Sequence, residues 1–271
     1  MHVGIVAQRG NPRAAELAED IRRALDARVS LDAETAESLG VEGRAADALV
    51  GCDLVVSIGG DGTFLYTARA VGDTPIMGVN LGEVGFLNAT PPDDAIRAVR
   101  AEVARLRSTD DPGFQEMAQV KATGDGFELP AALNEVTVLG PQRGHGQGVG
   151  IEVRLDGELY TGSRADGVIV ATPTGSTAYN LSEGGPLVHP DVNGFVVTEM
   201  CAEGPMPPLV VDPDRELTVR VEEAERAYVV ADGRTKHEVT PPTRIRLQRA
   251  ERPVRVAGPP LDFFAALGKL D

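Results

Sequence analysis

One carboxylate stands inside a glycine-rich turn in the first quarter of the chain. The turn, residues 59–63 with the sequence GGDGT, follows the apolar run 54–58 and precedes residues 63–70, which have the composition of a helix. A buried parallel strand that enters a helix through such a turn presents bare N–H groups and the positive end of the helix dipole. Glycines let a phosphate come close to these groups. We therefore interpret Asp61 as a reacting group at an anion-binding turn.

The stretch by itself also allows a purely structural alternative. Glycines at a strand-to-helix turn can serve only to reverse the chain, and an aspartate there can cap the helix that follows. The choice between the two interpretations depends on motifs elsewhere in the sequence.

A second polar pattern interrupts a predicted strand further along the chain. Residues 132–139 are mainly apolar, but they contain the adjacent pair Asn134 and Glu135. Neighbouring strand residues face opposite sides, so at least one of the pair is expected to point inward or into a cleft. The alternative is an edge strand with two solvated polar residues.

Residues 163–186 repeat the strand-turn-helix pattern with different side chains. The apolar run 167–171 follows Asp166 and leads into a turn crowded with Thr, Gly and Ser, and then into a helix start. Small hydroxyl residues beside glycines let a flat ring or a sugar approach closely. The structural alternative is a Ser or Thr that caps the helix.

The elements that must position these residues differ between the two halves of the chain. In the first half, strands are predicted at 3–7, 28–31, 54–58 and 75–79, and helices at 14–25, 45–50, 63–70 and 91–107. This alternation favours an α/β domain with an open, mostly parallel sheet and helices on both faces. Its ligands belong at the carboxyl ends of the strands, where the glycine turn and the loop beginning at Asn80 lie.

The second half shows the alternation and turns of antiparallel hairpins. Two hairpins are predicted around the Asp-Gly pairs 156–157 and 232–233, and further strands at 216–221 and 244–248. The glycine-rich residues 144–148 are expected to form a loop. We predict an α/β nucleotide-binding domain over 1–108, a β-rich domain over 109–255, and a C-terminal segment 256–271 whose apolar helix, 261–268, packs back on the first domain.

Composition narrows the functional classes. The formal net charge is −15, and only three of the 26 basic residues are lysines, which suggests a salt-loving source. Clustered Lys and Arg are needed to neutralise a nucleic-acid backbone, so this charge argues against nucleic-acid binding. No apolar stretch is long enough for a membrane span, and the chain enters a strand without a basic leader, so a cytoplasmic protein is expected. Cys52 and Cys201 lack metal-ligand spacing and are expected to be reduced thiols.

Taken together, five motifs resemble those of the NAD kinases, in the right order and over roughly residues 50 to 235. They are the glycine turn 59–63, residues 80–82 with 85–87, Asn134-Glu135, Asp166-Gly167, and residues 172–179 with the sequence TPTGSTAY. The first is shared with lipid kinases and more remotely with phosphofructokinases, whereas the last is highly specific. The resemblance implies phosphoryl transfer from ATP or polyphosphate to the 2′-hydroxyl of the adenosine ribose of NAD, giving NADP, with Asp61 as the general base.

The resemblance also implies where the substrates bind. Phosphates of the donor would be held by Gly59, Gly60, Gly62, Thr63 and Asn80. The residues implied to contact NAD are Asp61, Gly62, Asn134, Glu135, Arg164, Asp166, Thr174, Thr177, Ala178, Tyr179 and Ser182. Among these, Asn134 and Glu135 would hold the adenosine half and Asp166 the nicotinamide half, in a cleft to which both domains contribute. Mg²⁺ would accompany ATP, because the chain has no P-loop lysine and no assigned metal ligands, and a homodimer or homotetramer is implied.

Two other functions compete with this one. A lipid kinase of the diacylglycerol type would need an apolar pocket, whereas the second half offers Thr, Ser and Asn side chains. A non-catalytic dinucleotide sensor would keep the pocket, but retention of Asp61 speaks against it. The chain departs from the family pattern between residues 189 and 212, so no nucleotide contact is assigned to the loop 201–209.

Overall fold

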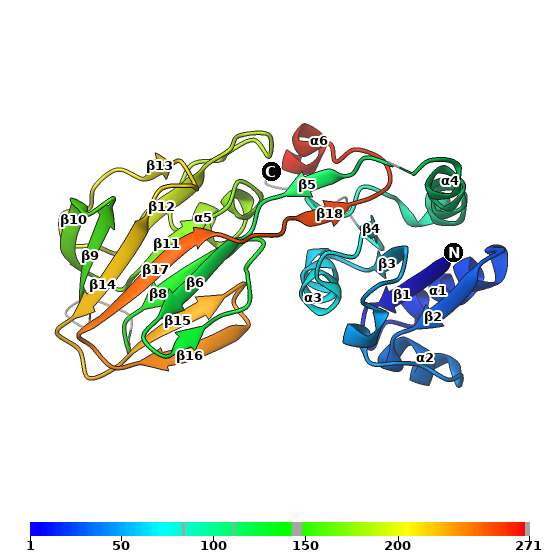
Figure 1. The fold of residues 1–271 in the computed structure, drawn as a ribbon, viewed down its shortest axis with the longest axis horizontal. Coiled ribbons are helices and arrows are strands. Elements are labelled where there is room, and N and C mark those ends of the chain that lie inside the picture. The colour runs from blue at the N-terminus through cyan, green and yellow to red at the C-terminus, as the bar shows by residue number, and fades with distance from the viewer. Residues whose placement is uncertain (83–84, 111, 143–147, 269–271) are drawn as a thin grey trace. The chain divides into compact units, whose positions relative to one another are not determined.

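A computed structural model describes residues 1–82, 85–110, 112–142 and 148–268 of the chain (Figure 1). The predicted loop at residues 144–147 therefore lies outside the described residues. The chain divides into two compact units: unit 1 is Met1–Met117 with Pro253–Asp271, and unit 2 is Ala118–Arg252. The sequence had placed the boundaries at 108 and 255. The observed boundaries differ from these because the segments just before and just after unit 2 form paired strands in the sheet of unit 1.

Unit 1 is built on one six-stranded sheet in the order β2-β1-β3-β4-β18-β5. Its strands are β1 (His2–Ala7), β2 (Arg28–Leu31), β3 (Leu54–Ile58), β4 (Ile76–Val79), β5 (Gln115–Met117) and β18 (Val254–Val256). All neighbours are parallel except β5, which runs antiparallel to β18. The predicted open, mostly parallel sheet is therefore confirmed.

Helices cover both faces of this sheet. They are α1 (Pro12–Ala24), α2 (Ala33–Leu39), η1 (Ala46–Leu49), α3 (Asp61–Val71), η2 (Pro92–Asp94), α4 (Ala95–Ser108) and α6 (Phe263–Leu267). Buried side chains of α1, α2 and α4 share one core with Val3, Ile5 and alternate residues of β3. Gly4 faces the other way and lies against Leu49 of η1, on which α3 packs.

Two helices of unit 1 differ from their predicted extents. The helix after the glycine turn begins at Asp61, with Gly60 as its N-cap, two residues earlier than predicted. The C-terminal helix begins two residues later than predicted, at Phe263, because Asp262 caps it by accepting the N–H of Ala265 at 2.9 Å. It packs back on unit 1 as predicted, with the ring of Phe263 centred 6.2 Å from that of Phe86.

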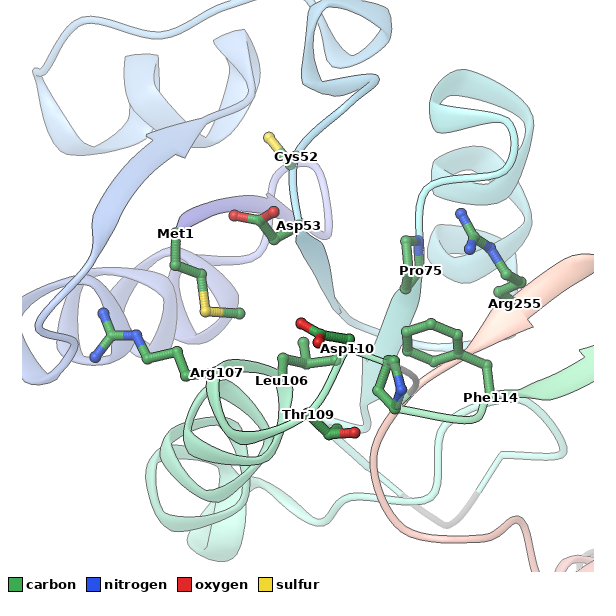
Figure 2. Close-up of a pocket in the computed structure, with 11 residues that line it drawn as sticks. Met1, Cys52, Asp53, Pro75, Leu106, Arg107, Thr109, Asp110, Phe114 and Arg255 are labelled. Atoms are coloured by element: carbon green, nitrogen blue, oxygen red, sulfur yellow. The ribbon is translucent and has the colours of Figure 1, made fainter.

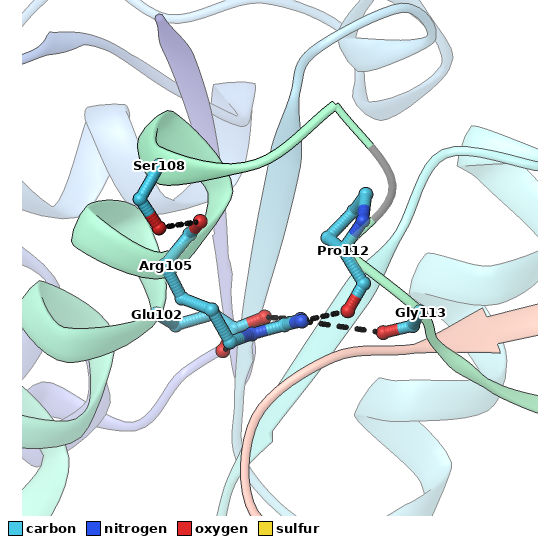
Figure 3. Close-up of polar contacts among 5 residues, drawn as sticks. All are labelled: Glu102, Arg105, Ser108, Pro112 and Gly113. Atoms are coloured by element: carbon cyan, nitrogen blue, oxygen red, sulfur yellow. Dashed lines mark hydrogen bonds and ion pairs between the residues drawn. The ribbon is translucent and has the colours of Figure 1, made fainter.

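The end of α4 is tied to the chain that follows it (Figure 3). The Arg105 guanidinium pairs with the nearly buried Glu102 carboxylate at 2.6 Å and donates to the carbonyl oxygens of Pro112 and Gly113. One side chain thus satisfies carbonyls of a loop and fixes the direction in which the chain leaves the helix toward β5.

Unit 2 contains two six-stranded antiparallel sheets, and the predicted β-rich, mostly antiparallel character of this half is confirmed. Their orders are β10-β9-β14-β17-β6-β7 and β13-β12-β11-β8-β15-β16. The strands are β6 (Val120–Gly124), β7 (Phe127–Glu128), β8 (Glu135–Leu139), β9 (Val149–Leu155), β10 (Glu158–Ala165), β11 (Gly167–Ala171), β12 (Phe195–Met200), β13 (Leu209–Val211), β14 (Leu217–Glu222), β15 (Ala227–Ala231), β16 (Thr235–Val239) and β17 (Thr243–Arg249). A core of mainly aliphatic side chains from both sheets holds the unit together, and a smaller cluster around Ile169 and Val196 lies beside it.

Both predicted hairpins are present. Asp156-Gly157 joins β9 to β10 and Asp232-Gly233 lies between β15 and β16, and all four residues have positive φ. Positive φ at both central residues matches the twist of the flanking strands and explains the Asp-Gly pairs. No helix in the described part of the chain is long and apolar enough to cross a membrane.

Candidate active site

The glycine turn of unit 1 leaves open space over the start of α3. Gly59 has φ 156°, and a Cβ there would lie 2.5 Å from Thr63 Oγ1, so only glycine fits. A Cβ at Gly60 or Gly62 would meet nothing within 4 Å. The first N–H groups of a helix point outward without intrahelical partners. The turn therefore offers donors and room to an anion.

Asp61 is the first residue of α3 and its side chain is half-buried. Its Oδ2 accepts the N–H of Phe86 at 3.2 Å, and its Oδ1 accepts the N–H of Leu87 at 3.2 Å and Nδ2 of Asn88 at 3.1 Å. Among the described residues these three donors all lie outside α3, whose N-cap is Gly60. The helix-cap interpretation of Asp61 is therefore wrong, and the carboxylate is held in one orientation by a loop 25 to 27 residues away.

Close backbone packing brings that loop to Asp61. A Cβ at Gly85 would lie 2.3 Å from Asp61 Oδ1, and one at Gly78 of β4 would lie 2.7 Å from the carbonyl oxygen of Leu87. Thr90 then joins the loop to the end of β4, because its carbonyl oxygen accepts the N–H of Asn80 at 2.8 Å. The lack of a side chain at Gly78 and Gly85 thus lets the loop approach Asp61. The hydrogen bond between Thr90 and Asn80 holds the loop at the end of β4.

Asn80, predicted to bind the donor, is buried within this loop. Its Oδ1 accepts the N–H of Gly82 at 3.1 Å, which closes a tight turn at the carboxyl end of β4. Residues 83–84 of the same motif lie outside the described residues.

In unit 2, Asn134 and Glu135 mark the beginning of a strand and do not interrupt one. β8 starts at Glu135 and lies between β11 and β15, so the edge-strand alternative is wrong. The Asp232 carboxylate accepts the N–H groups of Leu133, Asn134 and Glu135 at 3.0, 2.8 and 3.3 Å. A buried strand start with three otherwise unpaired N–H groups is thereby satisfied.

The Glu135 carboxyl group is enclosed and only partly satisfied. Its residue is 5% exposed, and Oε2 finds no hydrogen-bond partner among the described residues. Burial and the neighbouring Asp232 carboxylate raise the pKa of Glu135 to about 7, although the N–H of Tyr179 donates to the carboxylate and opposes the shift. A buried acid with an unused oxygen is typical of a site completed by a ligand.

The Thr-Gly-Ser motif packs directly on this pair. The N–H of Thr172 donates to the carbonyl oxygen of Asn134 at 2.8 Å, and a Cβ at Gly175 would lie only 1.9 Å from that oxygen. The short helices η3 (Thr174–Thr177) and α5 (Tyr179–Ser182) follow. The Thr172 hydroxyl oxygen accepts the N–H of Gly175 in the first turn of η3 at 3.1 Å, so the capping role given by the structural alternative is present here. The fold thus brings together Asn134, Glu135, Thr174, Thr177, Ala178 and Tyr179, with Ser182 exposed at the end of α5.

Arg164 and Asp166 lie apart from this group within unit 2. Ala171 of β11 pairs with Glu135, whereas Gly167 pairs with Leu139, so Asp166 precedes the opposite end of β11. Four residues of strand separate the two ends by about 13 Å. Arg164 pairs with Glu223 at 2.9 Å and donates to the carbonyl oxygen of Gly148 at 2.6 Å.

Comparison with known proteins identifies the family. The ATP-NAD kinase N-terminal domain matches residues 42–105 and the ATP-NAD kinase C-terminal domain matches residues 133–258. The NAD kinases of Natronomonas pharaonis and Halobacterium salinarum are 59% and 56% identical, each over the full length of both chains. The chain belongs to the NAD kinase family. It is therefore an enzyme, a phosphotransferase with NAD kinase activity.

Solved NAD kinase structures share the fold. An NAD kinase from Archaeoglobus fulgidus in complex with ATP superposes with a TM-score of 0.77 at 27% identity, covering 94% of this chain and 93% of that one. Yeast NADH kinase complexed with NADH gives a TM-score of 0.87 at 21% identity, covering 100% and 87%. The second likeness concerns the fold alone.

Two residues of this NAD kinase site were not identified from the sequence. Asp232 was interpreted only as a hairpin turn, and its carboxylate reaches residues 97 to 99 positions away. Asn88 was not singled out, because a lone polar residue after an apolar loop carries no periodic signal. Each could have been suspected only as a polar residue next to a motif.

Two cavities lined by described residues of unit 1 contain none of the predicted site residues. One of about 560 Å³ lies at the amino-terminal ends of β1, β3 and β4, between Asp53, Leu106 and Phe114 (Figure 2). The other, about 450 Å³, lies beside α4 and Pro259. In α/β sheets ligands bind at the opposite, carboxyl ends of the strands, where the glycine turn lies.

Proposed function

We propose that this NAD kinase transfers the γ-phosphoryl group of ATP to the 2′-hydroxyl of the adenosine ribose of NAD, with Asp61 as general base. The hydroxyl oxygen forms a bond to the γ-phosphorus, the bond to ADP breaks, and the hydroxyl proton passes to the carboxylate. The observation that supports this most is the immobilised Asp61 carboxylate at the start of α3, beside open N–H groups. Positioning of this kind supplies most of the catalysis in phosphoryl transfer.

We propose that unit 2 holds the dinucleotide. A ribose hydroxyl would give the buried Oε2 of Glu135 the hydrogen bond it lacks among the described residues, and Asn134 stands beside it. The wall of the pocket would come from residues 174–179, which pack on Asn134. Contact of Asp166 with the nicotinamide half and contact of Arg164 with NAD stay predictions, as do the homodimer or homotetramer and the cytoplasmic location.

We propose that ATP brings a divalent cation, Mg²⁺, with it. In the described part of the chain, no three His, Cys, Asp or Glu side chains lie close enough to hold a metal ion. Asp61 already accepts three hydrogen bonds, which leaves it poorly suited as a ligand. The cation would supply charge neutralisation to the phosphates, whereas Gly59, Gly60, Gly62 and Thr63 would contact the phosphates themselves.

The test is product formation by the purified chain in molar KCl. NAD or NADH is supplied with either ATP or polyphosphate, and phosphorus NMR determines whether a 2′-phosphomonoester forms. We expect NADP and ADP in equal amounts. Phosphorylation of diacylglycerol in place of NAD would establish the lipid kinase, and dinucleotide binding without transfer from either donor would establish the sensor.

A further inference from the structure

The two oxygens of Asp61 are occupied unequally. An ionised carboxylate has about four acceptor sites, two on each oxygen. In the described residues, Oδ1 accepts from both Leu87 and Asn88, whereas Oδ2 accepts only from Phe86. Oδ1 is therefore full, and Oδ2 retains one site for a further donor.

Asn88 fills that last site on Oδ1 at a cost to the fold. Its residue is fully buried, and its own Oδ1 has no hydrogen-bond partner among the described residues. A buried carbonyl without a partner is destabilising, whereas an aliphatic side chain of similar shape would carry no such penalty. The amide is therefore explained by its contact with Asp61 and not by packing.

The orientation of the Asn88 amide is also fixed. A rotation that exchanged its two ends would place a carbonyl oxygen against Asp61 Oδ1, so that two acceptors faced each other. In the observed orientation the carbonyl oxygen lies beside Gly78 of β4, where a Cβ would be 2.4 Å away. Gly78 thus makes room for the carbonyl oxygen while Nδ2 reaches Asp61 at 3.1 Å.

We propose that Asn88 is a positioning residue that saturates Oδ1 of Asp61 and leaves Oδ2 as the oxygen that receives the substrate hydroxyl. The proposal rests on the proposed role of Asp61 as the base. The hydroxyl donates to Oδ2, and its proton moves there as the oxygen–phosphorus bond forms and ADP departs. Without the Asn88 amide, either oxygen can face the substrate and fewer encounters are productive.

The test makes two comparisons. Asn88→Leu is compared with the unchanged enzyme, and the double variant with Asp61→Asn and Asn88→Leu is compared with Asp61→Asn alone. Loss of one hydrogen bond to a charged group predicts a kcat about ten- to thirtyfold lower, with KM for NAD within about twofold. The melting temperature should stay the same or rise, because the unpaired carbonyl is gone. In the Asp61→Asn background, the same substitution should change kcat less than about twofold, measured by enzymatic cycling of NADP.

Equal loss of kcat in both backgrounds would mean that Asn88 acts through the fold, and unchanged kcat in the Asn88→Leu enzyme would mean that it does not act at all. Either result overturns the proposal. If Leu does not fit, Asn88→Ala is measured in both backgrounds with the same expectation for kcat. The activity of Asp61→Asn alone tests the base separately, so failure of the proposed function is distinguishable from failure of this inference.

Discussion

The carboxylate of Asp232 accepts the backbone N–H of Asn134 at 2.8 Å. It also accepts the two flanking N–H groups, so one side chain from the turn between β15 and β16 holds the start of β8. The Asp-Gly turn that supplies it has φ values of 46° and 61°, the left-handed conformation that a tight hairpin turn requires. The hairpin thereby fixes the position of the backbone that carries the Asn134 and Glu135 side chains.

Asp232→Asn should weaken this anchor. An amide has only one acceptor oxygen for three N–H donors, so the free energy of unfolding should fall by about 1 to 3 kcal/mol. The KM for NAD should rise about tenfold while kcat changes less, because the pair that we propose to hold the adenosine half is displaced and the proposed base of unit 1 is not. Urea denaturation and steady-state kinetics measure both quantities.

The matched control is Asp156→Asn in the hairpin between β9 and β10. Asp156 occupies the same position of an Asp-Gly turn, but among the described residues its carboxylate accepts only from Arg215 and from the N–H of Glu216. Its KM for NAD should be unchanged. If the two variants raise KM alike, the anchor on Asn134 has no specific role.

The raised pKa of Glu135 predicts a pH-dependent stability. The folded-state pKa is about 7, against an ordinary value of 4.5. Between these values the folded chain binds more protons than the unfolded chain, so the free energy of unfolding should fall as pH rises from about 4.5 to about 7. Glu135→Gln cannot ionise and should be more stable than the unchanged enzyme at pH 8, by on the order of 3 kcal/mol.

Urea denaturation at pH 4.5, 6, 7 and 8 measures this difference. The two proteins should be close in stability at pH 4.5 and diverge at higher pH. Parallel pH profiles would show that Glu135 titrates normally in the folded chain.

Gly85→Ala should displace the Asp61 carboxylate, because the added Cβ would lie 2.3 Å from Oδ1. We expect kcat to fall about a hundredfold or more, in line with a misplaced reacting group. Gly82→Ala is the control, since a Cβ there meets nothing within 4 Å. A Gly85→Ala enzyme as active as Gly82→Ala would contradict the observed packing.

The acidic composition predicts that salt stabilises the chain. With a net charge of −15, the acidic side chains repel one another at low ionic strength, and molar salt screens this repulsion. The melting temperature should rise by about 10 °C between 0.1 and 2 M KCl, which corresponds to several kcal/mol for a chain of this size. Sucrose at the same concentrations separates screening from solvent exclusion. An equal rise in sucrose would rule out charge repulsion as the cause.

Local patterns were enough to predict much of the fold. The strand, glycine turn and helix around Asp61 and the two Asp-Gly hairpins follow from periodicity and turn chemistry within short windows. The insertion of β18 between β4 and β5 could not be predicted, because it pairs Val256 with Ile76 across 180 residues. Pairing over such separations depends on packing that no local pattern records.

The candidate site also contains residues that the sequence motifs indicated and residues that they did not. The motifs located Asp61 and Glu135, because glycines and buried acids stand out in an apolar context. Their partners did not stand out: Asn88 and Asp232 act through single side chains that reach distant backbone or carboxylate groups. A sequence pattern can indicate which residues could react or bind. The hydrogen bonds that position those residues form only in the folded chain.

The measurement that tests the account most directly is the turnover of Asp61→Asn. The amide keeps the size of the carboxylate but cannot take up the hydroxyl proton, so kcat should fall by roughly 10² to 10⁴. The dissociation constant for NAD, measured by calorimetry on the same preparation, should stay within about threefold. A variant that binds NAD and retains more than half of its turnover would show that Asp61 is not the base.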